Sequence, residues 1–157
     1  MPLEPFSVNA DEGRAYWTLN ELLTVIATAE QTGGTFALVE ELLNKAAEPP
    51  PHVHHLEDEA FYVLSGALTV RVGDRVFHAG PGAFVFCPRG IPHLLTVESA
   101  EVRMLTLVTP GGLERMFIDL GEPAQTRTLP PEPTQPDPER VAALATHYGA
   151  QVLTDWP

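Results

Sequence analysis

Residues 49–59 read PPPHVHHLEDE and contain three of the six histidines in the chain. In an extended strand, residues two apart project from the same face, so His52 and His54 can direct two imidazole rings at one point while Val53 faces the other way. Glu59 follows after a short turn, and a carboxylate that points inward there needs a counter-charge. This stretch predicts a metal-chelating site on one face of a β-strand.

A second stretch of turn residues leads to another histidine. Glycines and prolines at 80–82 and 88–92 bound the apolar run Phe84 to Phe86 and place His93 at the entry of a further strand. Considered alone, a Pro/His/acid-rich loop with a His-x-His pattern is more often a solvated segment than a metal site. Taken together, the two stretches make a fourth ligand available.

Short apolar runs bounded by glycine and proline recur through the middle of the chain, at 22–29, 60–64, 67–72, 84–86 and 102–108. Short strands at such intervals are typical of a sandwich or a barrel. Gly73-Asp74 fits a two-residue hairpin loop, because glycine tolerates the positive φ of a type II′ turn. We therefore predict an all-β fold in which Leu68 and Val70 face the interior.

The segment 36–48, FALVEELLNKAAE, admits two interpretations. It is rich in helix formers and has roughly helical apolar spacing, so in isolation it predicts a helix. The flanking Gly33-Gly34 and the prolines at 49–51 also permit a strand, and pairing with other strands often overrides local propensity. We interpret the segment as a strand.

The C-terminal part predicts two short helices joined by an extended strap. Apolar residues recur at helical spacing within 113–120, and Gly121 stands in the C′ position that ends a helix. The proline-rich stretch 123–138 cannot support a core and is typical of a surface strap. Asp137 as N-cap and Pro138 at the first helical position begin a final helix, which needs a surface to pack against.

Length and charge bound the class of protein. A chain of 157 residues has the usual size of one domain. We expect residues 1–122 to form a barrel with N-terminal strands and a short helix, and residues 123–157 to pack on the same domain. Nine basic against 21 acidic residues give a net charge of −12, which repels phosphate backbones and anionic lipid. Nucleic acid and membrane surfaces are therefore not expected as partners.

Cellular location is inferred from three features of the sequence. The N-terminal residues form neither a basic leader nor an apolar core of a signal peptide, and no apolar run approaches the ~20 residues of a spanning helix. Cys87 is the single cysteine, so no internal disulfide can form. We expect a cytoplasmic protein.

The spacings His52-x-His54-x4-Glu59-x6-Gly66 and Gly82-x5-Pro88-x-Gly90-x2-His93 resemble the two paired motifs of the cupin superfamily. Fifteen residues separate them, as in compact single-domain cupins. Ala46 and Val97 depart from the glycine and asparagine usual at those positions. The flanks at 13–17, 30–34 and 110–115 resemble the monocupins commonly labelled quercetin 2,3-dioxygenase-like.

This resemblance implies a jelly-roll β-barrel that commonly forms a homodimer, and it implies that His52, His54, Glu59 and His93 carry one metal ion. It also implies that Glu59 is a catalytic proton acceptor as well as a ligand. Three neutral imidazoles and one carboxylate suit a divalent Fe, Mn, Ni, Co, Cu or Zn ion. The sequence does not choose among these metals.

Other side chains near the motifs are assigned by strand parity. Phe61, Phe86, Leu95 and Met104 are candidates for the pocket lining, although such residues on barrel strands are more often plain core. His55 has the opposite parity to the ligands and is expected outside the site. Glu57 and Asp58 are interpreted as a solvated turn, Cys87 as a buried side chain without chemistry, and His147 as part of the polar surface of the last helix.

Two classes of function fit these expectations. An oxygen-dependent dioxygenase acting on a flavonol-like or other enolic small molecule needs an open metal position and an apolar pocket. The alternative is a non-catalytic cupin that binds metal or small molecules, or a metal-dependent isomerase or hydrolase with the same four ligands. One scaffold hosts many chemistries, so the fold alone does not separate them.

Overall fold

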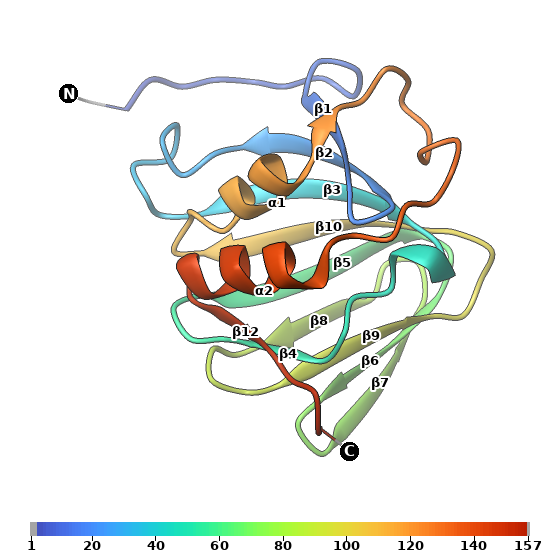
Figure 1. Ribbon diagram of the computed structural model, residues 1–157. Helices are drawn as coiled ribbons and strands as arrows, with labels where there is room; N and C mark the ends of the chain where they lie inside the picture. The colour runs from blue at the N-terminus through green and yellow to red at the C-terminus, as the bar shows by residue number, and fades with distance from the viewer. Residues whose placement is uncertain (1–2, 157) are drawn as a thin grey trace.

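The computed structural model describes residues 3–156. Met1, Pro2 and Pro157, which fall within the expected segments 1–122 and 123–157, lie outside the described residues. Two antiparallel sheets make up most of the molecule, with strand orders β11-β1-β2-β3-β10-β5-β8 and β12-β4-β9-β6-β7 (Figure 1). The predicted all-β jelly-roll barrel is confirmed.

The elements are short and follow one another closely. The larger sheet contains β1 (Arg14–Thr18), β2 (Glu21–Ala27), β3 (Ala37–Leu43), β5 (Asp58–Ser65), β8 (Phe84–Cys87), β10 (Val102–Thr109) and β11 (Glu122–Pro123). The smaller sheet contains β4 (His52–His54), β6 (Leu68–Val72), β7 (Arg75–Ala79), β9 (His93–Val97) and β12 (Ala150–Val152). The helices are η1 (Lys45–Ala47, 3-10), α1 (Glu114–Leu120) and α2 (Pro138–His147).

The ambiguous segment 36–48 is a strand over most of its length. β3 pairs with both β2 and β10, and its residues alternate between buried and half-buried. Pairing on both sides gives the strand backbone hydrogen-bonding neighbours, which outweighs the helix propensity of the isolated sequence. The helical tendency survives only in η1, where the Asn44 side chain accepts a hydrogen bond from the Ala46 amide.

The β6–β7 hairpin turns at Gly73-Asp74 as expected, with Gly73 at a φ of 55°. Leu68 and Val70 are buried in the interior. A second two-residue turn, at Leu19-Asn20 between β1 and β2, was not predicted from the sequence. Both of its residues have positive φ, 49° and 69°, as a type I′ turn requires.

The two C-terminal helices lie where they were predicted. The Asp137 side chain accepts a hydrogen bond from the Glu139 amide and caps α2. Gly121 ends α1, but its φ of −97° is not the left-handed conformation typical of a C′ glycine. Close packing explains this glycine instead, because a Cβ atom there would lie 2.9 Å from the Trp17 carbonyl oxygen.

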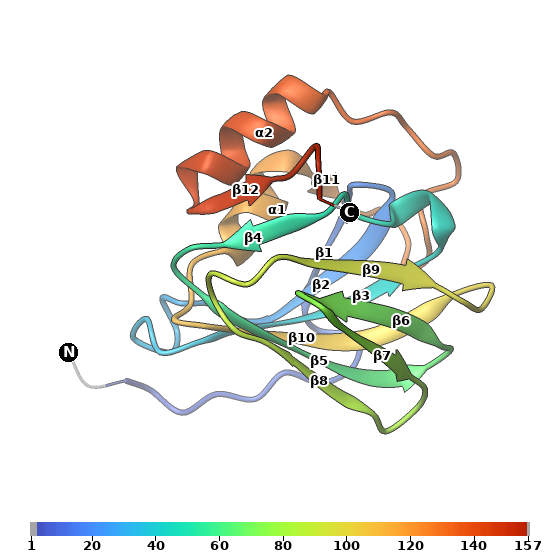
Figure 2. The same cartoon turned by 90° about the horizontal axis from the view of Figure 1, so that it is seen from below.

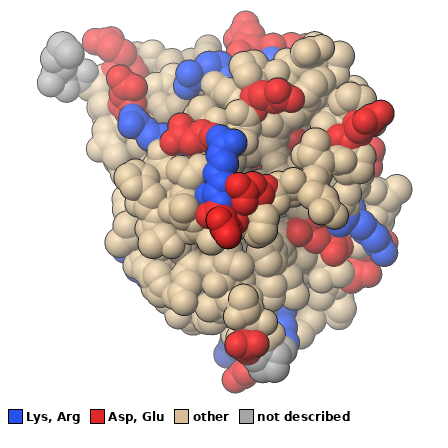
Figure 3. All heavy atoms as spheres, viewed as in Figure 1, with Lys and Arg blue, Asp and Glu red and all other residues tan. Residues whose placement is uncertain are grey.

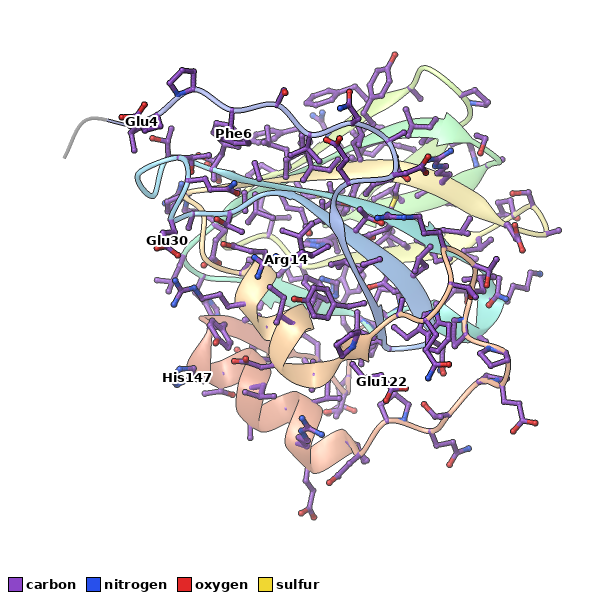
Figure 4. The ribbon with its side chains drawn as sticks, turned by 90° about the horizontal axis from the view of Figure 1, so that it is seen from above. Glu4, Phe6, Arg14, Glu30, Glu122 and His147 are labelled. Atoms are coloured by element: carbon purple, nitrogen blue, oxygen red, sulfur yellow. The ribbon has the colours of Figure 1, made fainter. Side chains whose placement is uncertain are left out.

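α1 packs on the inner side of the larger sheet and α2 packs on α1 and β12, while the N-terminal segment runs along the outer side of that sheet (Figures 2 and 4). After α2 the chain forms β12, which pairs with β4 and becomes an edge strand of the smaller sheet. This last strand was not predicted. His147 is exposed on the outer side of α2, as expected (Figure 4).

The segment between β11 and α2 is extended and mostly exposed, as predicted for a strap. Its Thr134 amide donates to the Asn20 side chain, and Arg127 donates to the carbonyl oxygens of Asp11 and Gly13. No helix in residues 3–156 combines the length and apolar character needed to span a membrane. On the face in Figure 3, acidic side chains are spread over the surface with basic ones beside them, in line with the net charge of −12.

Candidate metal centre

Three strands from both sheets bring His52, His54, Glu59 and His93 together. β4 supplies His52 and His54, and β9 supplies His93, which is paired in register with His52. Glu59 comes from β5 of the larger sheet and is 5% exposed. One ligand atom from each residue lies within 4.8 Å of the others. The structure therefore assembles all four residues that the sequence analysis singled out, and we refer to them as the four-residue cluster.

The side chains of the cluster are in contact. The ring centroids of His52 and His93 are 4.3 Å apart, and those of His52 and His54 are 5.0 Å apart. Glu59 Oε2 lies 2.9 Å from His93 Nε2 and 3.3 Å from His54 Nε2. Three imidazoles and one carboxylate thus converge on a single small volume.

Backbone carbonyl groups orient two of the imidazole rings. His52 Nδ1 lies 2.9 Å from the Pro50 carbonyl oxygen, and His93 Nδ1 lies 3.4 Å from that of Ile91. In each case an Nδ1–H donates to the carbonyl two residues earlier, which leaves Nε2 as the acceptor nitrogen. Such hydrogen bonds fix the tautomer and the ring orientation of histidines that bind metals.

The protonation of the cluster follows from its burial and internal charges. Burial, with a contribution from His93, lowers the pKa of His52 to about 4, so this ring is neutral at neutral pH. Burial opposes charge on His54, but the Glu59 carboxylate outweighs it and raises the pKa of His54. Burial also opposes charge on Glu59, yet His54 and His93 hold its pKa well below its ordinary value. The cluster therefore contains one carboxylate and neutralises it with an imidazole proton.

Unpartnered nitrogen atoms indicate what the cluster is suited to hold. His54 Nδ1 and Nε2 are buried and make no hydrogen bond of good geometry. Buried polar atoms are normally paired, so such atoms call for a partner. A divalent cation would satisfy the nitrogen that faces Glu59 and replace the shared proton. The donor set of three nitrogens and one oxygen suits first-row divalent metals.

A family model described as a cupin domain matches residues 39–109, a range that contains the whole four-residue cluster. The quercetin 2,3-dioxygenase of Bacillus subtilis (strain 168) is 28% identical over 129 residues, which are 82% of this chain and 38% of that protein. By the match to the family model, residues 39–109 form a cupin domain. An RmlC-like cupin from Shewanella frigidimarina shares the fold, with a TM-score of 0.61 at 15% identity over 73% of this chain and 99% of that one.

A second relative is the quercetin 2,3-dioxygenase of Aspergillus japonicus, 31% identical over 88 residues, which cover 52% of this chain and 25% of that protein. The chain thus spans between a quarter and two fifths of the length of the two dioxygenases that it matches. The family match and the four-residue cluster together support a divalent metal as its cofactor.

A cavity of about 350 Å³ opens beside the cluster. His52, His54 and Glu59 line it, whereas His93 is 1% exposed and lies behind them. The walls are mainly apolar, and their members include three residues expected there, Phe61, Leu95 and Met104. Small-molecule sites are typically apolar cavities with a few polar groups, and this volume lies at the lower end of their range.

The expectation that Phe86 lines the pocket is wrong. Glu59 faces inward and pairs with Cys87, and because side chains alternate along a strand, Val85 and Cys87 also face inward. Phe86 therefore projects from the outer face, where it is 50% exposed. It is not among the residues that line the cavity.

The expectation for Glu57 is also wrong. Glu57 is buried and its Oε2 has no hydrogen-bond partner, whereas Asp58 pairs with Arg89 at 2.9 Å. His55 is exposed and contacts Gln151, as its parity predicted. Cys87 is buried, and burial raises the pKa of its thiol, so it has no nucleophilic character.

The sequence analysis missed two carboxyl groups of the cavity, Glu21 and Glu41. The sequence did contain an indication for Glu41. If residues 36–48 form a strand, Glu41 lies on the same face as the apolar Val39 and Leu43 and therefore points inward. Glu21 begins β2, next to the unpredicted turn, and gave no such signal.

Proposed function

We propose that the four-residue cluster binds one divalent transition metal and that the loaded cupin is a dioxygenase of a flavonol-like or other enolic small molecule. The observation that carries this proposal is the position of the cluster. Three of its four side chains line an apolar cavity of about 350 Å³, so a small molecule in the cavity can reach the metal ligands directly.

The bound metal would supply a Lewis acid for an enolate oxygen, which makes an electron-rich carbon skeleton available to dioxygen. The chain itself must take the proton that leaves the enol. Glu59 is the carboxylate of the cluster, its Oε2 lies 2.9 Å from His93 Nε2, and it is the group placed to take that proton. Phe61, Leu95 and Met104 exclude water from the remainder of the cavity, which strengthens every charge interaction within it.

Metal analysis followed by oxygen uptake tests the proposal. The purified cupin is expected to contain one divalent metal per chain and to consume dioxygen with at least one member of a panel of flavonols and 1,3-diketones. Chelator-treated protein and anaerobic reactions are the controls. If the metal-loaded protein consumes no dioxygen with any enolic substrate, the non-catalytic, isomerase or hydrolase alternatives replace the dioxygenase and the metal site stands.

We also propose that the cupin is a homodimer. The outer face of β5, β8 and β10 exposes large apolar side chains, namely Tyr62, Leu64, Phe84, Phe86 and Leu107. Patches of this kind on soluble proteins mark interaction sites. A second copy is the expected partner, because each chain has a net charge of −12 and two copies meet most easily on an uncharged face.

A further inference from the structure

Two buried carboxyl groups face the cavity and have no part in the four-residue cluster. Glu21 begins β2 and is 5% exposed, and Glu41 lies in β3 and is 6% exposed. Both line the same cavity as His52, His54 and Glu59. We refer to Glu21 and Glu41 as the carboxyl pair.

The order of strands separates the carboxyl pair from the cluster. β10 lies between β3, which carries Glu41, and β5, which carries Glu59. Two strand spacings amount to about 9.6 Å between the backbones of β3 and β5. β2 lies one strand further on, so Glu21 is more distant still. The cavity therefore has a cluster end and a carboxyl end.

The carboxyl pair has no counter-charge. Within residues 3–156, neither side chain forms an ion pair, no lysine or arginine lines the cavity, and the neutral Thr106 hydroxyl is the polar group beside Glu41. Burying such groups without a partner costs free energy, and an apolar side chain on the same strand face would avoid that cost. A ligand that bonds to the two carboxyl groups would offset it.

We propose that the carboxyl pair binds hydroxyl groups at the end of the substrate remote from the four-residue cluster. This inference rests on the proposed function and narrows its substrate class. The preferred substrate is an enolic aromatic molecule that carries a second hydroxyl group on another ring, rather than a wholly apolar enol.

The chemistry of carboxyl groups favours a hydroxyl over a charged group at this end. An anionic substituent would be repelled by the Glu59 carboxylate, and it would hold Glu21 and Glu41 in their protonated form rather than gain an ion pair from them. Burial, aided by the Glu59 charge, raises the pKa of Glu41 to about 8, and the Thr106 hydroxyl opposes this only in part. Burial and the same like charges raise the pKa of Glu21 well above its ordinary value. A neutral carboxyl group both donates and accepts hydrogen bonds, and so does a hydroxyl.

Ligand binding to the Zn²⁺-loaded cupin under anaerobic conditions tests the inference. The probes are 3-hydroxyflavone, 3,4′-dihydroxyflavone and 3,7-dihydroxyflavone, which differ only in the second hydroxyl. We expect at least one dihydroxyflavone to bind the wild type about tenfold more tightly than 3-hydroxyflavone, as a satisfied buried hydrogen bond allows. The affinity ratio is the Kd of 3-hydroxyflavone divided by the Kd of the dihydroxyflavone. Glu41→Leu and Glu21→Leu should reduce this ratio toward one without weakening the binding of 3-hydroxyflavone.

Two further variants sharpen the test. Glu41→Gln should keep part of the ratio, because an amide of the same size still donates and accepts hydrogen bonds. Glu40→Gln is the matched control: Glu40 is next in the chain but on the other face of β3, where it pairs with Arg103 at 2.7 Å. It should leave the ratio unchanged.

Three results would overturn the inference. They are a ratio of one in the wild type, equal weakening of all probes by the leucine variants, and no binding of any probe to the Zn²⁺-loaded protein. Failure of the dioxygenase proposal is distinguished by oxygen uptake. Absent uptake with an intact ratio contradicts the dioxygenase alone, whereas intact uptake with a ratio of one contradicts the carboxyl pair alone.

Discussion

Glu59 determines the charge state of the cluster that surrounds it. Its carboxylate is buried between two imidazoles, at 2.9 Å from His93 and 3.3 Å from His54, and it stays ionised because those rings can share a proton with it. The same three groups would give a divalent metal two nitrogens and one oxygen. Metal binding and proton uptake therefore compete for the same atoms.

Replacing Glu59 by glutamine separates ligation from proton transfer. Glu59→Gln keeps the size and one oxygen ligand but removes the charge and most of the basicity. If Glu59 is both ligand and base, the variant should retain some metal while oxygen consumption with an enol falls by roughly 10²–10⁴-fold. A substrate supplied already deprotonated at higher pH should recover part of the rate. Activity that merely tracks metal content, with no recovery beyond the wild-type trend, would leave Glu59 as a ligand only.

Removing any one imidazole should release the metal. His52→Ala, His54→Ala and His93→Ala each delete one of the four donors, and we expect at least a hundredfold weaker metal binding. At saturating metal such a loss removes about 2.7 kcal/mol of ligand-linked stability. Inductively coupled plasma analysis and thermal unfolding measure both effects. His55→Ala is the control, because His55 is exposed and should not change either quantity. Full occupancy in the three variants would contradict the four-ligand arrangement.

Metal affinity should rise with pH because of His54. The pKa of His54 is raised above 6.5 by Glu59, so this ring must lose a proton before it can coordinate. Its ion pair with Glu59 stabilises the metal-free fold fully below pH 6.5, and that contribution is lost as the pH rises through the raised pKa. Zn²⁺ titrations between pH 6 and pH 8 should show up to a tenfold gain per unit. His52, with a pKa of about 4, adds nothing in that range. A flat profile would contradict the shared proton.

At the scale of elements, strands were predicted best where the alternation of side chains and the residues typical of turns indicate the same strand boundaries. The β6–β7 hairpin and the β4 histidines follow from glycine and from two-residue alternation. Phe86 was misplaced because the register of β8 depends on its pairing of Cys87 with Glu59, a contact 28 positions apart in the chain. β12 was missed because three residues carry no pattern, and it exists only through its pairing with β4.

The turn between β5 and β6 depends on Gly66, which ends the first motif. Gly66 has a φ of 79°, and a Cβ there would meet the Glu101 carbonyl oxygen and lie 3.0 Å from Val102 Cα. Gly66→Ala should therefore lower the free energy of unfolding by about 1–3 kcal/mol or more. Gly80→Ala is the matched control, since nothing lies within 4 Å of its Cβ position and its φ is not positive. Urea unfolding that shows equal stability for both variants would refute the turn's dependence on glycine.

At the scale of the whole molecule, the two faces of the larger sheet have different roles. The inner face carries Glu21, Glu41 and Glu59, and α1, α2 and β12 lie on that side of the sheet, so its polar groups line a cavity and not the outer surface. Part of the outer face lies beside the N-terminal segment (Figures 2 and 4), but β5 and β8 keep their apolar side chains exposed. The parity that places ligands inside the barrel also places Phe84 and Phe86 outside it.

That outer face should hold two chains together. We expect the wild type to have twice the 17.1 kDa mass of one chain in light scattering, with dissociation on dilution. The double variant Phe84→Ser and Phe86→Ser removes side chains that are 63% and 50% exposed, and it should be monomeric with an unchanged fold. Val76→Ser is the control, because Val76 is 55% exposed but lies on β7 of the other sheet. A wild type that is monomeric at every concentration contradicts the dimer, whereas a double variant that stays dimeric moves the interface elsewhere. Because neither phenylalanine lines the cavity, metal content should be the same in all three proteins.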